Sequence, residues 1–131
     1  MKSIFEHKCI VFCADHYNPL GICRSLGEKG INPIVVLTDS HASMIPHCKY
    51  VKEIYFVKNE EEGVNFLIEN FGNEQNKPFI FTGSDDTTRV LDLHYDELKD
   101  KFYFYNGGCQ GNITKYQNKE VITEAALACG C

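Results

Sequence analysis

The sequence predicts an α/β fold, a Rossmann-like three-layer α/β/α sandwich around a mostly parallel five-stranded sheet. Two observations support this prediction. Short, continuous apolar runs, typical of strands that are buried on both faces, alternate along the chain with segments of helical periodicity. Such alternation indicates β–α–β units, whose right-handed crossovers place helices on both faces of a parallel sheet.

Size and composition fit one globular domain. The chain has 131 residues, of which 44% are hydrophobic and 24% are charged. The net charge is −5 and no basic run is present, which argues against a nucleic-acid partner. The apolar run near the N-terminus is too short for a signal peptide or a membrane span. We therefore expect a cytoplasmic protein that binds neither nucleic acid nor a membrane.

The predicted strands are short runs rich in β-branched and aromatic residues. Their ranges are 9–14, 34–37, 54–57, 78–82 and 102–105.

Helix signals follow most of these runs. Asn18 as N-cap and Pro19 at the first helical position predict a helix that Lys29 and Gly30 end. Glutamates 60–62 occupy the first turn of a second helix, where the helix dipole favours anions, and Gly72 ends it.

The third helix follows the sequence GSDD. Its inner face is predicted to carry Leu91, His94, Tyr95 and Leu98, which makes His94 a core histidine in our interpretation. After a short helical turn near 114–117, the sequence NKEVITEAALACGC (118–131) predicts a final helix. Its apolar stripe comprises Val121, Ile122, Ala125 and Cys129.

Three loops are predicted at the carboxyl edge of the sheet, where open α/β sheets bind ligands: 15–21, 38–43 and 83–87. Neither a dinucleotide-binding glycine fingerprint nor a Walker A sequence occurs there. The helix start at Asn18 could receive an anion, although simple capping is the favoured interpretation of this residue. His16 is the histidine best placed for a function, with loop solvation as the alternative.

Carboxylates also lie at this edge. Of Asp85 and Asp86, one is predicted to cap the amides of Thr87 and Thr88, and Arg89 is placed to pair with either. Adjacent carboxylates at a helix start do not by themselves form a catalytic pair.

The seven cysteines are odd in number and irregular in spacing, so free thiols are expected. His41, His47 and Cys48 form a local cluster without a second ligand pair, which favours a surface loop over a zinc site.

The order of these elements resembles the N-terminal domain of ATP-grasp ligases, the family of biotin carboxylase, the carbamoyl-phosphate synthase large subunit and D-aspartate ligase. The resemblance lies in four segments that span nearly the whole chain: NPLGICRSLGEKGINPIVVLTD, HCKYVKEIYFV, FIFTGSDDTTRVLDLHYDELKDKF and NKEVITEAALACGC. The last segment is similar to the Asp-Lys helix of the family, with Asn118 in place of the aspartate.

The resemblance implies a domain at 1–111 and the start of a truncated ATP-grasp domain at 112–131. It implies an enzyme that uses ATP and Mg²⁺ to join a carboxylate to an amine, with this fragment inactive alone. Lys119 matches an ATP contact, and no metal ligand is expected in this chain. The substrate-side candidates are Asp15, His16, Asn18, Gly21, Ser84 and Asp85.

Other interpretations stay open. The implied partners are the small-molecule carboxylate and amine substrates and a downstream ATP-grasp domain, and a homodimer is left open. The chain would alternatively be a stand-alone small-molecule or nucleotide-binding module without catalysis, or a scaffold that associates through its last helix.

Overall fold

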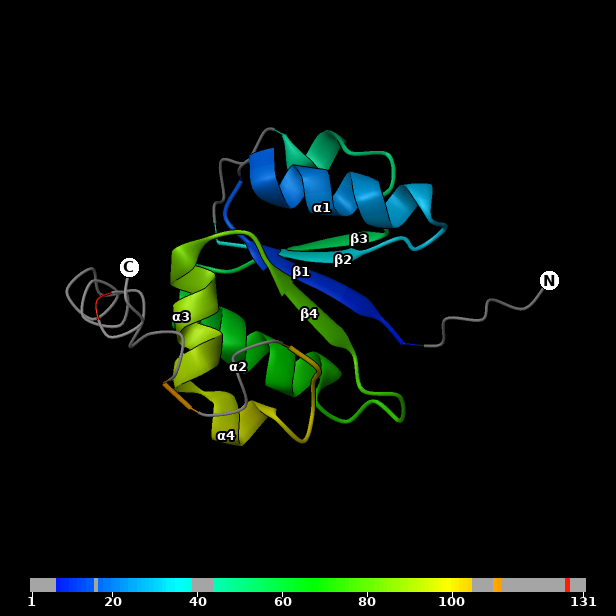
Figure 1. Ribbon diagram of the computed structural model, residues 1–131. Helices are drawn as coiled ribbons and strands as arrows, with labels where there is room; N and C mark the ends of the chain where they lie inside the picture. The colour runs from blue at the N-terminus through cyan, green and yellow to red at the C-terminus, as the bar shows by residue number, and fades with distance from the viewer. Residues whose placement is uncertain (1–6, 16, 39–43, 105–109, 112–126, 128–131) are drawn as a thin grey trace.

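Figure 1 shows the computed structural model, which describes residues 7–15, 17–38, 44–104, 110, 111 and 127. The elements, in chain order, are β1 (Cys9–Cys13), α1 (Tyr17–Glu28), β2 (Ile34–Leu37), the 3-10 helix η1 (Ile45–His47), β3 (Glu53–Phe56), α2 (Glu60–Phe71), β4 (Phe79–Thr82), α3 (Asp85–Leu93) and α4 (Tyr95–Leu98).

The four strands form one parallel sheet in the order β3-β2-β1-β4. Helix α1 lies on one face of the sheet, and α2, α3 and α4 lie on the other (Figure 1). The predicted α/β class with helices on both faces of a parallel sheet is therefore confirmed. Because the chain leaves β1 toward β2 but later returns to place β4 on the opposite side, the connections reverse between β1 and β4.

The side chains of β1 divide the core into two clusters. Ile10 and Phe12 pack toward α2 and α3, whereas Val11 and Cys13 pack toward α1. All five residues of β1 are at most 3% exposed. A central strand covered on both faces explains the continuous apolar run in this part of the sequence.

The prediction of a fifth strand at 102–105 is wrong for the described residues 102–104, because the sheet that the described residues form has four strands. Here the chain makes a single parallel bridge between Tyr103 and Phe79, with hydrogen bonds from the Tyr103 amide to Pro78 and from the Ile80 amide to Tyr103. Phe102 is buried and Phe104 contacts the Tyr95 ring edge-on. The alternating aromatic pattern arises from this packing rather than from an extended ladder of strand pairs.

The predicted start of the first helix is also wrong. Helix α1 begins at Tyr17, so Asn18 lies inside its first turn and does not form the N-cap. The predicted end is confirmed: Gly30 has a φ of +83°. The Ile31 amide donates to the Leu26 carbonyl and the Gly30 amide to the Gly27 carbonyl, which is the Schellman pattern that favours glycine.

Helix α2 begins as predicted, with its three glutamates in the first turn and Gly72 directly after its last residue. Asn59 is its N-cap and accepts a hydrogen bond from the Glu62 amide at 2.8 Å.

The third predicted helix is interrupted at His94, which separates α3 from α4. The prediction of a core position for His94 is wrong, since its side chain is 29% exposed. Nε2 lies 2.9 Å from a carboxylate oxygen of Glu61 in α2, and Nδ1 lies 3.1 Å from one of Glu97 in α4. These contacts link α2 to the junction of α3 and α4.

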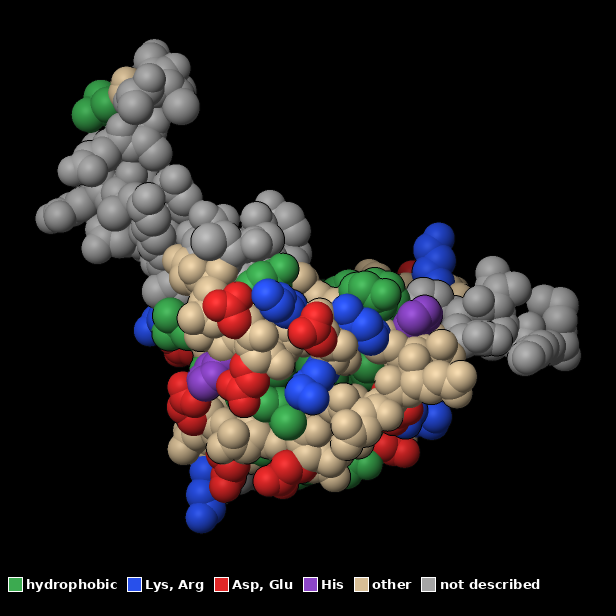
Figure 2. Space-filling view, turned by 90° about the horizontal axis from the view of Figure 1, so that it is seen from below, with side chains coloured by type: hydrophobic (Ala, Val, Ile, Leu, Met, Phe, Trp, Pro, Cys, Tyr) green, Lys and Arg blue, Asp and Glu red, His purple; other side chains and the backbone are tan. Residues whose placement is uncertain are grey.

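Figure 2 shows the face formed by α2, α3 and α4, where acidic and basic side chains alternate over the surface. The predicted helical turn at 114–117 and the predicted helix at 118–131 lie outside the described residues, except Leu127, which is helical and 67% exposed. Among the helices described, none combines the length and apolar character needed to cross a bilayer.

Candidate functional site

The loops that follow β1 and β4 meet at the carboxyl edge of the sheet, where the chain direction reverses. A Cβ atom on Gly83, directly after β4, would lie 2.7 Å from a ring atom of Pro19 in the first turn of α1. This close approach brings two of the three predicted loops together. Open α/β sheets bind their ligands at such a reversal, so this edge is the candidate site that the fold indicates.

Asp15 lies two residues after the end of β1, and its carboxylate binds backbone. One oxygen accepts a hydrogen bond from the Met44 amide at 3.0 Å, and the other accepts from the Ile45 amide at 2.9 Å. These amides open η1, so Asp15 caps that helix and fixes the loop after β2 to the end of β1. The structure thus gives Asp15 a structural role at the predicted site.

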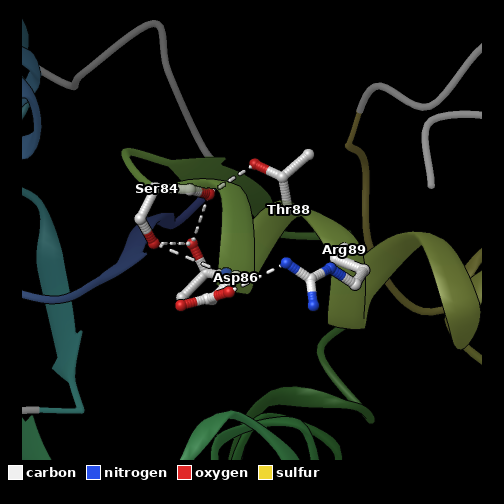
Figure 3. A network of polar contacts seen from close by, with 5 residues as sticks. Ser84, Asp86, Thr88 and Arg89 are labelled. Atoms are coloured by element: carbon white, nitrogen blue, oxygen red, sulfur yellow. Dashed lines mark hydrogen bonds and ion pairs between the residues drawn. The ribbon is translucent and has the colours of Figure 1, made fainter. Parts of the chain in front are cut away.

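Ser84 forms the N-cap of α3 (Figure 3). Its hydroxyl lies 2.8 Å from the Thr87 hydroxyl and accepts from the Thr87 amide at 3.4 Å. The Thr88 hydroxyl donates to the Ser84 carbonyl at 2.8 Å and lies 2.6 Å from the Thr82 hydroxyl at the end of β4. A network of hydroxyl groups therefore joins the end of β4 to the first turn of α3.

This network corrects the capping prediction, because Ser84, and not Asp85 or Asp86, caps α3. Both carboxylates lie exposed in the first turn, where the helix dipole favours them. The predicted ion pair is confirmed for Asp86, whose carboxylate lies 3.0 Å from the Arg89 guanidinium (Figure 3).

The structure describes two of the four remaining predicted site residues. Asn18 and Gly21 are exposed on α1, and no atom lies within 4 Å of a Cβ built on Gly21. His16 and Lys119 lie outside the described residues. The edge thus brings together two segments that are far apart in the sequence, one with Asp15 and Asn18 and the other with Ser84 and Asp85.

A hollow of about 760 Å³ lies beyond the carboxyl ends of β2 and β3. It is lined by Thr38, Phe56, Val57, Lys58, Glu62, Asn65, Phe66 and Glu69. Of these, only Thr38 belongs to a loop that the sequence predicts at the ligand edge. A helical spacing could have revealed the four lining residues of α2, since residues 62, 65, 66 and 69 share one face of that helix.

This hollow combines aromatic and polar groups. Phe66 packs against the Tyr55 ring at a centroid distance of 5.0 Å, and Phe56 is 52% exposed. Glu62 accepts a hydrogen bond from the Lys58 amide at 2.6 Å, which stabilises the start of α2. The lining suits a small ligand with both an apolar body and polar groups.

Two buried thiols lie on the α1 side of the sheet. Burial, with a further contribution from nearby Cys48, raises the pKa of Cys23 to about 12. Burial also raises the pKa of Cys13, assisted by Cys23 and Asp15. Neutral, buried thiols are poor nucleophiles, so these two act as small core residues. Cys48, by contrast, is half-buried.

Within the described ranges, no group of three or more His, Cys, Asp or Glu side chains is arranged to hold a metal ion. Comparison with protein-family models, curated proteins and solved structures gave no match. The resemblance to ATP-grasp ligases, the boundary after residue 111 and the role of Lys119 therefore stay predictions.

Proposed function

We propose that the chain is the N-terminal, substrate-side domain of an ATP-dependent carboxylate–amine ligase. The observation that supports this proposal is the strand order β3-β2-β1-β4, with the loops after β1 and β4 in contact through Gly83 and Pro19. That arrangement creates a ligand-binding edge of the type that substrate domains use. The identity of the reaction rests on the resemblance in sequence.

The proposed reaction has two steps. A carboxylate oxygen of the substrate attacks the γ-phosphorus of ATP, ADP leaves, and an acylphosphate forms. The amine then attacks the acyl carbon, phosphate leaves, and the amine loses a proton as the amide forms. Mg²⁺, when bound, neutralises charge on the transferring phosphoryl group.

This chain would supply the acceptor-substrate side of the cleft. Asn18 and Asp85 are exposed at the carboxyl edge, and Ser84 directly precedes Asp85 as the N-cap of α3. An amide, a hydroxyl and a carboxylate together suit a substrate that carries both an ammonium and a carboxylate group. Lys119 would contact ATP. The metal ligands of the reaction would lie outside this chain, so the fragment alone would be inactive.

The coding sequence beyond Cys131 provides the first test. We expect it to continue into a β-rich lobe that contains a second lysine, a glycine-rich loop and later Glu and Asn metal ligands. The extended protein should release ADP only when a carboxylate and an amine are both supplied, as measured by a coupled assay over a panel of each.

Two lysine variants of that extended protein test the predicted role of Lys119. Lys119→Ala should lower kcat/KM at least about tenfold, because a cation that contacts phosphate stabilises developing charge. Lys115→Ala, four residues earlier, is the control and should have little effect. A stop codon directly after Cys131, or an extended protein without substrate-dependent ADP release, would refute the ligase proposal.

The alternative is a stand-alone small-molecule-binding module, and the hollow of about 760 Å³ beside α2 favours it. Calorimetric titration of the 131-residue chain with ATP and with amino acids separates the two proposals. Binding that Phe66→Ala abolishes would favour the module, since Phe66 lines that hollow and lies apart from the β1–β4 edge.

A further inference from the structure

A groove of about 440 Å³ lies between the second half of α1 and the segment that begins with η1. Its lining residues are Arg24, Glu28, His47, Cys48, Lys49 and Tyr50. We refer to it as the α1 groove. Arg24 and Glu28 lie five and nine residues after Pro19 of the β1–β4 edge, which is about 8 Å and about 13 Å along the helix axis. The groove is therefore distinct from the site of the proposed ligase function and does not depend on it.

The floor of the α1 groove is a fixed aromatic ring. Tyr50 packs directly on the backbone of α1 at Gly27, where an added Cβ would overlap the Tyr50 side chain. Glycine at this position is what allows the Tyr50 side chain to approach the helix backbone so closely. A ring held in this way offers an apolar surface on which a planar ligand can stack, with little loss of conformational entropy.

The walls of the α1 groove carry an excess of positive charge. Arg24, Lys49 and His47 line the groove together with a single carboxylate, that of Glu28. Lys49 Nζ lies 5.0 Å from the centroid of the Tyr50 ring. In the part of the chain that the structure describes, no hydrogen bond or ion pair engages the side chain of Arg24 or His47.

This basic concentration stands out in a chain of net charge −5. A guanidinium without an ion-pair partner presents a planar fork of donors that matches a carboxylate or a phosphate group. We propose that the α1 groove binds small molecules that combine a carboxylate or phosphate group with a planar apolar body. The anionic group pairs with Arg24 and Lys49, and the planar body lies on Tyr50.

Cys48 lines the same groove and can report occupancy chemically. An aryl disulfide bearing carboxylates, such as dithiobis-nitrobenzoate, is both a ligand of the proposed class and a thiol reagent. The Cys48 thiol loses its proton to solvent and the thiolate attacks one sulfur of the reagent. A mixed disulfide forms, the reagent's S–S bond breaks, and one nitrothiobenzoate leaves with the electron pair.

The experiment measures the rate of this reaction in the full chain with Cys109, Cys129 and Cys131 replaced by serine. The remaining thiols besides Cys48 are the buried Cys9, Cys13 and Cys23. The rate is compared with that of cystamine, a dicationic disulfide, and peptide mapping assigns the modified residue. The quantity of interest is the rate ratio, the rate with the anionic reagent divided by the rate with cystamine. We expect this rate ratio at low salt to be about tenfold higher in the protein than in a model cysteine peptide.

Three variants test the charges. Arg24→Gln and Lys49→Gln should each lower that ratio about threefold, because one unit charge is removed close to the bound anion. Lys29→Gln is the matched control and should leave the rate ratio unchanged. It removes a positive charge directly after α1, at a residue that does not line the groove. A ratio that Arg24→Gln leaves unchanged overturns the proposal.

Unreactive benzoate tests binding without the thiol chemistry. Calorimetry should detect benzoate binding that is weaker in Arg24→Gln, and acetate should bind less tightly because it has no ring for Tyr50. Benzoate should also slow modification of Cys48 by the aryl disulfide. Absence of benzoate binding, or equal binding by the wild type and Arg24→Gln, overturns the proposal whether or not Cys48 reacts with the disulfide.

Discussion

The two ends of α1 use polar side chains in opposite ways. At its start, near β1 and β4, the Asp15 carboxylate and the Ser84 hydroxyl hydrogen-bond to backbone amides. In its second half, Arg24 projects from the helix into the α1 groove, where the described residues provide it with no ion-pair partner. Polar side chains after β1 and β4 therefore bind backbone amides, whereas Arg24, which has no ion-pair partner among the described residues, can bind a ligand.

The largest expected effect on folding is at Gly83. Gly83→Val would place side-chain atoms against the Pro19 ring and separate the β4 loop from α1. We expect the free energy of unfolding to fall by about 2–3 kcal/mol, measured by urea denaturation. Gly21→Ala is the control, because its Cβ would meet no atom within 4 Å, and it should be neutral or slightly stabilising. Equal effects of the two variants would contradict the close approach.

Asp15→Ala should be the next most damaging change. It removes two charge-assisted hydrogen bonds to the amides of Met44 and Ile45 and leaves the start of η1 uncapped. The expected loss is about 2 kcal/mol, again from urea denaturation, with faster amide hydrogen exchange at Met44 and Ile45. Asp100→Ala, at an exposed turn, serves as the control. Unchanged exchange at both amides would show that Asp15 does not hold this loop.

Ser84→Ala should cost about 1 kcal/mol, because the Thr87 amide loses its side-chain acceptor and the Thr87 hydroxyl loses a partner. The measurement is the thermal midpoint, compared with that of Ser25→Ala on the exposed side of α1. Ser84→Asp should restore most of the loss, since aspartate is also a good N-cap. A failure of aspartate to restore stability would argue that Ser84 acts other than as a cap.

The smallest effect is expected for Arg24→Gln, whose free energy of unfolding should stay within about 0.5 kcal/mol of the wild type. No ion pair or hydrogen bond of the described residues is lost with this guanidinium. Urea denaturation of the same sample used for ligand binding provides the check. A loss comparable to that of Asp15→Ala would indicate a structural role and remove the contrast between the two ends of α1.

The strands and helices near the middle of the sheet could be predicted from local patterns. The apolar run of β1, the glutamate-rich start of α2 and the glycine after α1 are each dictated by neighbouring residues. Errors arose where several residue types satisfy the same local rule. Ser84 and Asp85 are both good caps, and Tyr17 precedes two residues, Asn18 and Pro19, that would themselves suit a helix start.

The prediction of a fifth strand was wrong for a different reason. Phe102, Tyr103 and Phe104 alternate between buried and exposed positions, as in a strand, but only Tyr103 pairs with the sheet. Alternation predicts which side chains face the core. The number of backbone hydrogen bonds depends on how many residues run alongside β4, and no local sequence pattern predicts that number.

Local preferences in the sequence determined the alternation of strands and helices, the buried central strand and the polar groups at the strand ends. Those features depend on residues within a few positions of one another. The tertiary structure alone decided which groups meet: Asp15 with the amides of η1, Gly83 with Pro19, and Tyr50 with Gly27. Such contacts join residues that are distant in sequence, and the packing of α1 on the sheet decides whether a polar side chain is held by backbone or left to a ligand.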